Sequence, residues 1–275
     1  MVVVFIFISK ILPITFVQLK VNEDPGTFLY NAAMKKFMAN LFQVYVWLII
    51  YPLAWTLTVL AAITISILSI MGAVQFAGRY VAKPWGRIVL WITPVSVSRL
   101  GQLQIEAGQS YVVVANHQSI YDILVIYGYL PLDFKWVMKI ELRKMPFVGF
   151  ACEKMGHIYV DRRNRKASIQ AMDVAKDQLV NGTSVFFFPE GTRNNGEQLK
   201  SFKKGAFKMA RDLQLPILPV SISGANRVMP TNGVKIMPGK ITMTFHAPIT
   251  LDQINAMDDK SVAQLAYATV ANAVV

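Results

Sequence analysis

The stretch of residues 41–74 constrains the fold more than any other feature, because these 34 residues include no Asp, Glu, Lys or Arg. About 20 helical residues are enough to cross the apolar core of a bilayer, which is about 30 Å thick. A core helix of a soluble protein would carry polar residues on one face, whereas this stretch is apolar on every face apart from scattered Thr, Ser and Gln. We therefore expect residues 41–74 to associate with a membrane.

The length of this stretch leaves two geometries open. As a single straight helix it would be about 50 Å long, which is more than one crossing needs. Pro52 also removes a backbone donor within it. A kinked span and a tight helical hairpin both fit, and a hairpin could sit in one leaflet without crossing. A second apolar stretch, residues 1–19, fits either a membrane-dipping helix or a start site chosen too early.

Basic residues lie on both sides of the long apolar stretch. They are Lys35, Lys36, Arg79, Lys83, Arg87 and Arg99. Their distribution favours an inner or cytoplasmic membrane, with the larger C-terminal part on the cytosolic side. Residues 79–100 alternate basic with bulky apolar residues, which fits equally well an amphipathic segment at the lipid headgroups and a helix packed on the globular part.

The composition narrows the function classes. Lys and Arg number 28 against 16 Asp and Glu, and the resulting net charge of +12 attracts the phosphates of nucleic acid, anionic lipid or a soluble substrate. Hydrophobic residues make up 54% of the chain and charged residues 16%, which excludes intrinsic disorder and a charged coiled coil. The single cysteine, Cys152, excludes an intramolecular disulfide and favours a reducing compartment.

From Gly101 onward, short apolar runs alternate with helical patterns that carry charges. This alternation predicts an α/β fold with a central mixed sheet flanked by helices. Strands are expected over 111–115, 134–138, 157–160, 183–188 and 217–223, with 240–246 at an edge, and helices over 119–129, 141–154, 165–180 and 202–212. We therefore divide the chain into N-terminal membrane-associated helices, residues 1–100, and an α/β domain, residues 101–275.

The first motif that carries chemistry is His117 with Asp122, directly after an expected strand. Inside one regular helix these side chains would point about 140° apart. If His117 lies in the turn and Asp122 in the first helical turn, the carboxylate can approach the imidazole. Asp122 would then orient His117 as a general base for a hydroxyl substrate. The alternative for His117 is a turn histidine with a satisfied hydrogen bond.

The second motif, residues 186–193, also ends an expected strand. Gly191 gives the backbone the freedom to present Thr192 and Arg193 outward, and the planar guanidinium of Arg193 suits a phosphate. The basic residues that follow fit either an anion-attracting rim or a solvated helix face. Lys139 follows a third expected strand, so we expect these motifs to meet at one edge of the sheet.

Together, four ordered motifs resemble the glycerolipid acyltransferases, and within them the 1-acyl-glycerol-3-phosphate acyltransferases. They are Asn116-His117-x4-Asp122, Lys139-x-Glu141-Leu142-x3-Pro146-x2-Gly149, Phe188-Pro189-Glu190-Gly191-Thr192-Arg193 and Pro216-Ile217-Leu218-Pro219-Val220. The resemblance covers roughly residues 100–250.

The resemblance implies transfer of a fatty acyl group from acyl-CoA or acyl carrier protein to the sn-2 hydroxyl of lysophosphatidate, giving phosphatidate. His117 and Asp122 would be catalytic. The implied substrate-binding residues are Lys139, Glu190, Gly191, Thr192 and Arg193. The expected partners are lysophosphatidate, the acyl donor and membrane lipid, with no nucleic acid, and the reaction calls for neither a metal nor a redox cofactor.

Two alternatives remain at this stage. An acyltransferase of the same family could act on another lysophospholipid or on glycerol-3-phosphate. A membrane-tethered protein that binds anionic lipid or nucleic acid would instead use the charge of +12 without turnover.

Overall fold

The computed structural model describes residues 25–102, 104–106, 108–161, 163–164, 170, 179, 182–194, 198–231 and 233–274. The apolar stretch over residues 1–19 lies outside these residues, and the helix expected over 165–180 lies almost wholly outside them. The chain divides into two compact units at Val44 and Tyr45.

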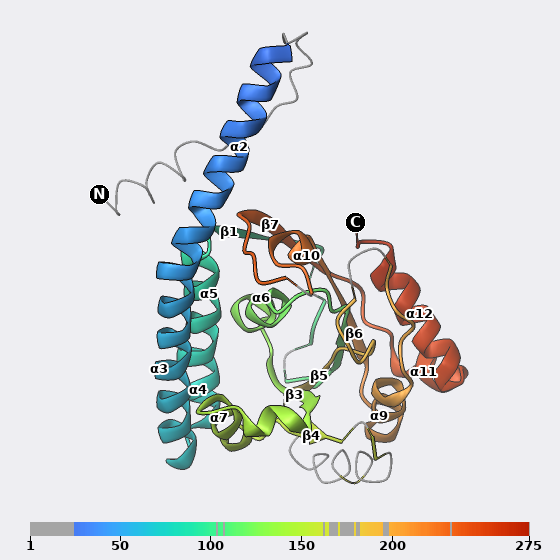
Figure 1. Ribbon diagram of the computed structural model, residues 1–275. Helices are drawn as coiled ribbons and strands as arrows, with labels where there is room; N and C mark the ends of the chain where they lie inside the picture. Colours follow the sequence, from blue (N-terminus) through green and yellow to red (C-terminus); the bar gives the residue numbers. More distant parts are fainter. Residues whose placement is uncertain are drawn as a thin grey trace. The chain divides into compact units, whose positions relative to one another are not determined.

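A seven-stranded mixed sheet forms the centre of the second unit, with the strand order β1-β7-β6-β2-β5-β3-β4 (Figure 1). The strands are β1 (Val95–Leu100), β2 (Val112–Ala115), β3 (Asp133–Lys139), β4 (Ile158–Val160), β5 (Thr183–Phe187), β6 (Ile217–Ser223) and β7 (Gly239–Phe245). All neighbouring strands pair in parallel except β6 and β7, which are antiparallel. The predicted central mixed sheet flanked by helices is confirmed.

Two strand expectations need correction. Residues 95–100, placed at the end of the amphipathic segment, form β1, whose alternation of Val and Ser is typical of a strand. Because β1 pairs with β7 in parallel register, β7 lies inside the sheet, and its expected place at the edge was wrong.

Within the second unit, helices lie on both sides of the sheet (Figure 1). The N-terminal helices are α2 (Pro25–Tyr45), η1 (Val46–Ile50), α3 (Tyr51–Ile70), α4 (Val74–Ala77), η2 (Gly78–Ala82) and α5 (Lys83–Ile92). The others are α6 (Tyr121–Tyr129), η3 (Ile140–Lys144), α7 (Val148–Lys154), α9 (Gly205–Leu213), α10 (Ala225–Val228), α11 (Leu251–Ala256) and α12 (Asp259–Ala271).

The helix over Lys36–Ile70 is, among the described residues, long and apolar enough to cross a membrane by its length and composition. Only 28% of its most apolar window is buried within the chain, unlike the core helix of a soluble protein. In the second unit, α3 ends at Ile70 with Met71 as its C-cap, and Gly72, with φ of +83°, supports the turn into α4. The helix α3 packs against both α4 and α5, so a helical hairpin precedes the sheet.

The helix α5 joins this hairpin to the rest of the domain by packing against α6. Gly86 and Gly128 lie at the crossing, and a Cβ on Gly86 would come within 2.8 Å of the carbonyl oxygen of Leu124. Arg87 Nε donates to the carbonyl of Gly128 at 2.6 Å. Of the two interpretations of residues 79–100, the packed helix is therefore observed for α5.

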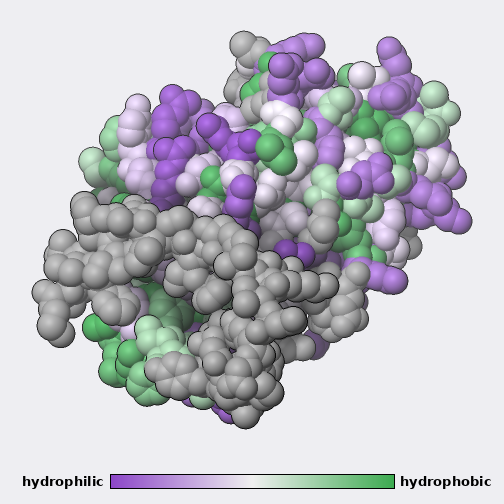
Figure 2. Space-filling view, turned by 90° about the horizontal axis from the view of Figure 1, so that it is seen from above, coloured by the Kyte–Doolittle hydropathy of each residue, from purple (hydrophilic) through white to green (hydrophobic). Residues whose placement is uncertain are grey.

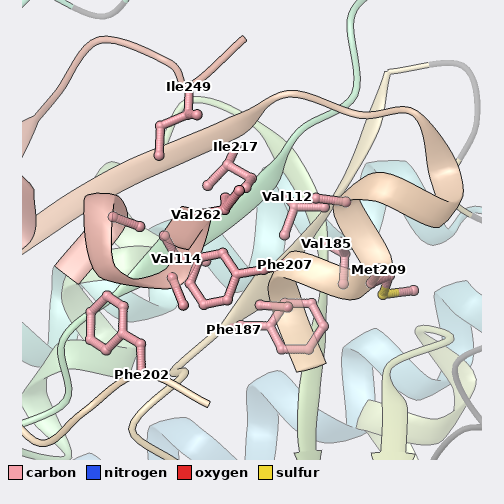
Figure 3. Close-up of a cluster of buried hydrophobic side chains, with 14 of the residues drawn as sticks. Val112, Val114, Val185, Phe187, Phe202, Phe207, Met209, Ile217, Ile249 and Val262 are labelled. Atoms are coloured by element: carbon pink, nitrogen blue, oxygen red, sulfur yellow. The ribbon is translucent and has the colours of Figure 1, made fainter. Parts of the chain in front are cut away.

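The largest described core lies between the sheet and α9, α11 and α12 (Figure 3). Val112 and Val114 of β2 and Ile217 of β6 meet Phe207 of α9 and Val262 of α12 there, all with no exposed surface. In the view from above, hydrophilic and hydrophobic residues are interspersed on the side of α11 and α12, as on a water-exposed surface (Figure 2). The core therefore holds the sheet rigid behind the strand ends that carry the motifs.

Candidate active site

Asn116 connects the turn after β2 to the neighbouring strand β6 through hydrogen bonds. Its side-chain amide donates to the carbonyl of Ile222 at 2.7 Å, and the Ile222 N–H donates back to Asn116 Oδ1 at 2.8 Å. Asn116 has no exposed surface, and a buried amide that satisfies two backbone groups is a strong local restraint. The position of His117, the next residue, is therefore set by β6 as well as by β2.

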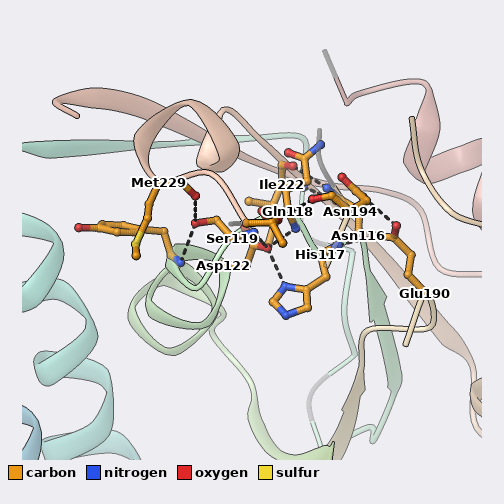
Figure 4. A network of polar contacts seen from close by, with 11 residues as sticks. Asn116, His117, Gln118, Ser119, Asp122, Glu190, Asn194, Ile222 and Met229 are labelled. Atoms are coloured by element: carbon orange, nitrogen blue, oxygen red, sulfur yellow. Dashed lines mark hydrogen bonds and ion pairs between the residues drawn. The ribbon is translucent and has the colours of Figure 1, made fainter. Parts of the chain in front are cut away.

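His117 and Asp122 point toward each other from this turn and from the first turn of α6 (Figure 4). His117 Nδ1 lies 2.8 Å from Asp122 Oδ2. The two residues do not share one helix, since α6 begins at Tyr121, and the chain bend removes the divergence of about 140° that a continuous helix would impose.

The carboxylate of Asp122 is buried and receives several donors. Asp122 Oδ2 accepts from the N–H groups of Gln118 at 2.7 Å and Ser119 at 2.9 Å, in addition to His117. These donors stabilise a negative charge that has lost its contact with water. An ionised carboxylate can only accept, so the proton of neutral His117 lies on Nδ1 and leaves Nε2 to take a proton.

Phe188 supports the other side of the imidazole. Its ring stacks on His117 with the centroids 3.9 Å apart and the planes 8° from parallel. The His117 side chain keeps 15% of its surface exposed, while Asp122 has none. The imidazole is thus held between an aromatic face and a carboxylate, with access to a substrate.

Glu190 joins the second motif to the first from a buried position, with only 3% of its surface exposed. Glu190 Oε1 accepts from the N–H of His117 at 2.7 Å, and Oε2 accepts from Asn194 Nδ2 at 2.7 Å and the N–H of Lys200 at 2.9 Å. These contacts give Glu190 the geometry of a residue that organises the loop around His117.

The neighbours of Glu190 face outward, as the motif predicts. Gly191 has φ of +76°, a left-handed conformation that favours glycine, while a Cβ there would meet only the flexible end of the Lys203 side chain. Thr192 and Arg193 are exposed. Lys200 Nζ donates to Thr192 Oγ1 at 3.0 Å and to the carbonyl of Arg193 at 2.8 Å, which fixes the loop while the guanidinium stays accessible.

Lys139 ends β3 and is exposed. The strands β2, β5 and β3 are parallel neighbours, so their carboxyl ends meet at one edge of the sheet. The structure therefore brings Lys139 to the same edge as His117 and the loop of Arg193. This edge is the place where α/β sheets bind ligands.

Sequence reasoning missed three residues that hold the site together. Asn194 is buried and its N–H donates to the carbonyl of His117 at 2.8 Å, and Ser119 Oγ donates to the carbonyl of Met229 at 2.8 Å. Thr231 Oγ1 lies 2.8 Å from the carbonyl of Gln118 and 2.7 Å from that of Asn194. Polar residues inside or beside the motifs were the available signal for Asn194 and Ser119, but nothing marked Thr231.

Among the residues that the structure describes, no group of three His, Cys, Asp or Glu side chains is placed to hold a metal ion. The described site combines a buried carboxylate, an oriented imidazole and an exposed cationic loop. Such a set of groups on an α/β sheet is typical of enzymes that take a proton from a hydroxyl group and attract an anion.

Comparison with known proteins gives this class a family. Residues 97–223 match the model of the Acyltransferase family. A chloroplast 1-acyl-sn-glycerol-3-phosphate acyltransferase of Arabidopsis thaliana is 32% identical over 172 residues, which cover 62% of this chain and 48% of the relative. A 1-acyl-sn-glycerol-3-phosphate acyltransferase of Helicobacter pylori is 33% identical over 157 residues, covering 57% of this chain and 62% of the relative.

A solved structure supports the fold. The crystal structure of the 1-acyl-sn-glycerophosphate acyltransferase PlsC from Thermotoga maritima matches with a TM-score of 0.62 and 27% identity, over 79% of this chain and 93% of that one. The match to the plant relative covers about half of that relative's length. The resemblance to the glycerolipid acyltransferases is confirmed.

Proposed function

We propose that the protein transfers a fatty acyl group to the sn-2 hydroxyl of 1-acyl-glycerol-3-phosphate and so forms phosphatidate. The observation that carries the proposal is the 2.8 Å contact between His117 Nδ1 and the buried Asp122, beside the exposed Arg193 loop. Relatives named 1-acyl-sn-glycerol-3-phosphate acyltransferase match this chain over 172 and 157 residues. The acyl donor is acyl-CoA or acyl carrier protein.

The reaction begins with removal of a proton. His117 Nε2 accepts the hydroxyl proton as the acceptor oxygen attacks the thioester carbonyl, and Asp122 stabilises the imidazolium that forms. The tetrahedral intermediate collapses with cleavage of the carbon–sulfur bond, and the imidazolium returns the proton to the departing thiolate. No covalent acyl-enzyme forms, and the step requires neither a resident metal nor a redox cofactor.

The acceptor is held by its phosphate. Arg193 provides a planar fork that matches phosphate oxygens, and Lys139 adds a second cation at the same edge of the sheet. Gly191 and Thr192 line the loop, and Glu190 acts through it by positioning His117 and Asn194. The basic flanks of the apolar helix favour a catalytic domain on the cytosolic side of the membrane.

An acyl-transfer assay tests the proposal. The purified protein is given lysophosphatidate, glycerol-3-phosphate or lysophosphatidylcholine, each with acyl-CoA and with acylated carrier protein. Phosphatidate formation that exceeds turnover of the other acceptors supports the proposal. Turnover of glycerol-3-phosphate or another lysophospholipid, with negligible use of lysophosphatidate, would favour an acyltransferase of the same family with a different acceptor. Binding of anionic lipid without turnover of any acceptor would contradict both acyltransferase functions.

A further inference from the structure

Exposed apolar side chains are concentrated in the segment that follows Lys139 and take no part in the proposed chemistry. The η3–α7 surface consists of the exposed large apolar side chains of η3, α7 and the bend between them. These are Ile140 (40% exposed), Leu142 (39%), Met145 (39%), Phe147 (52%) and Phe150 (49%). Exposed apolar side chains gathered within one short segment and accompanied by charges are typical of a docking surface.

The backbone beneath the surface holds it in a fixed shape. Gly149 is buried, and a Cβ there would come within 2.2 Å of the carbonyl oxygen of Arg143, so only glycine lets α7 lie this close to η3. Arg143 pairs through two nitrogens with Glu153, at 2.9 and 2.7 Å, and Tyr159 donates to the carbonyl of Gly149 at 3.0 Å. The apolar side chains are therefore presented by an ordered platform.

The backbone conformation of Phe147 indicates that this segment serves a function and not only the stability of the fold. It precedes α7 with φ of +61°, a region that a bulky residue rarely occupies and that costs about 1–3 kcal/mol. The strain is not offset by burial, since about half of the side chain is exposed. Strained backbone conformations of this kind cluster at functional sites and ligand contacts.

The surface adjoins the apolar helix α3. Ala151 and Met155 pack with Ala62 and Ile65 in one cluster, so α7 lies against the C-terminal half of α3 (Figure 1). Other residues of that half of α3, and the residue that follows it, remain exposed and apolar. They are Ile63, Ile67, Ile70 and Met71.

The charge of this segment indicates which partner the apolar surface binds. Residues 139–154 include four basic residues, Lys139, Arg143, Lys144 and Lys154, and two acidic ones, Glu141 and Glu153, for a net charge of +2. Lys154 Nζ lies 5.2 Å from the centre of the Phe150 ring. Aromatic and aliphatic groups interspersed with lysine suit the headgroup level of an anionic bilayer.

We propose that the η3–α7 surface is a second lipid contact, which rests on an anionic membrane beside α3 and sets the carboxyl edge of the sheet against the lipid. The surface begins one residue after Lys139, which the proposed function assigns to the acceptor phosphate. On that function, the surface would place the site where a lipid acceptor can enter it from the bilayer.

Depth-dependent quenching tests the contact. In full-length protein with Cys152→Ala, a nitrobenzoxadiazole label is attached at Phe147→Cys or at Phe150→Cys, and the protein is reconstituted in vesicles of phosphatidylcholine and phosphatidylglycerol. The matched control is Leu265→Cys on α12, another exposed apolar position. We expect lipids with brominated chains to quench the two η3–α7 labels severalfold more than the control, and aqueous iodide to show the reverse order.

Several outcomes would overturn the proposal. Equal quenching at all three positions would show that the surface lies in water. If an acidic carrier protein protects the labels from iodide while brominated lipid does not quench them, the surface binds a protein instead of lipid. If Phe147→Cys does not fold, as judged by circular dichroism, labels at Met145→Cys and Phe150→Cys carry the same test.

Charge is tested separately from depth. The double variant Lys144→Gln with Lys154→Gln should show less quenching by lipid on anionic vesicles. The control variant Lys260→Gln on α12 should be quenched as strongly as the labelled parent protein. Equal quenching of the double variant, the control variant and the parent protein would contradict the preference for anionic lipid. Acyl transfer by the labelled proteins in detergent micelles separates the two proposals. Lost turnover with retained quenching removes the proposed function alone, and retained turnover without quenching removes the lipid contact alone.

Discussion

The imidazole of His117 depends on Asp122 for both its tautomer and its orientation, because the carboxylate lies 2.8 Å from Nδ1. His117→Ala and Asp122→Asn should each lower kcat by about 10²–10⁴, the usual contribution of a positioned general base. Initial rates of phosphatidate formation measure the change. His246→Gln is the control, since its Nε2 contacts Ser221 Oγ at 2.7 Å and the proposed chemistry does not use it. Full activity of His117→Ala with an intact fold would contradict the base assignment.

Glu190 offers a test of the loop. Its two oxygens accept from His117, Asn194 and Lys200, so each partner supplies an N–H. In Glu190→Gln the new amide group would face at least one of these donors, and an unsatisfied buried group costs about 1–3 kcal/mol. We expect a lower melting temperature and a lower kcat. Wild-type values of both would show that Glu190 does not hold His117 in place.

His157 supplies a prediction on pH. The ring is buried between Tyr127, whose hydroxyl lies 2.9 Å from Nε2, and the N–H of Trp136, which donates to Nδ1 at 3.3 Å. Burial, with a smaller contribution from the charge of Lys135, lowers the pKa of His157 to about 3. The unfolded chain, with a histidine pKa of about 6.5, therefore binds the proton first, and stability falls as the pH drops below about 6.5.

The size of this loss follows from linkage. Between pH 7 and pH 5 the His157 site should remove about 2 kcal/mol from the free energy of unfolding, at up to about 1.4 kcal/mol per pH unit. His157→Gln lowers stability at neutral pH but abolishes this part of the slope. Thermal unfolding in detergent at several pH values measures the difference between the two proteins. Parallel pH profiles would mean that His157 titrates normally in the folded state.

Among single residues, the sequence predicted those whose contacts are with residues nearby in the chain. His117 and Asp122 are five positions apart, so their pairing needed only a turn at the right place. The contact of Thr231 with the carbonyl of Gln118 joins residues 113 positions apart, and the contact of Ser119 with Met229 joins residues 110 apart. Such contacts depend on the sheet order, which periodicity and spacing do not specify.

Among the elements, the crossing of α5 and α6 is the most sensitive to a single methyl group. A Cβ on Gly86 would lie 2.8 Å from the carbonyl oxygen of Leu124 and 3.1 Å from the N–H nitrogen of Gly128. Gly86→Ala should therefore destabilise the domain by about 1–3 kcal/mol, the usual cost of overpacking.

The matched control for this crossing is Gly205→Ala at the start of α9, where nothing lies within 4 Å of the added carbon. That change should be neutral or stabilising by about 0.4–1 kcal/mol, because alanine restricts the unfolded chain. Chemical denaturation of both variants measures the difference. A stabilising effect of Gly86→Ala would mean that α5 does not pack on α6 at this distance.

Elements with strong local patterns were predicted best. The runs that became β2, β5 and β6 are β-branched or aromatic, and their core-facing residues pack on Phe207 of α9 in the interior. The pattern over residues 95–100 was ambiguous, because Arg99 and the exposed Leu100 accompany the valines, and only pairing with β7 makes this segment a strand. Position within the sheet is a property of the partners, so β7 was assigned to the wrong place.

For the molecule as a whole, the positive charge links the fold to its proposed lipid substrate. The net charge of +12 acts over a Debye length of about 10 Å at 0.1 M salt and about 3 Å at 1 M. Raising the salt concentration over this range should increase the KM for lysophosphatidate in anionic vesicles severalfold, because attraction to the surface and to the exposed Arg193 is screened. The turnover number kcat should change little, since the contact between His117 and Asp122 is short and shielded from solvent.

Two variants separate the contribution of the site from that of the overall charge. Arg193→Gln should raise the KM for lysophosphatidate at low salt. The KM of this variant should rise less on addition of salt, because the contact with phosphate that salt would screen is already missing. Lys260→Gln, on the exposed face of α12, removes the same charge far along the chain and should keep the wild-type salt response. If salt instead lowers kcat at constant KM, or if both variants respond alike, the cationic edge does not select the acceptor and its phosphate must be bound elsewhere.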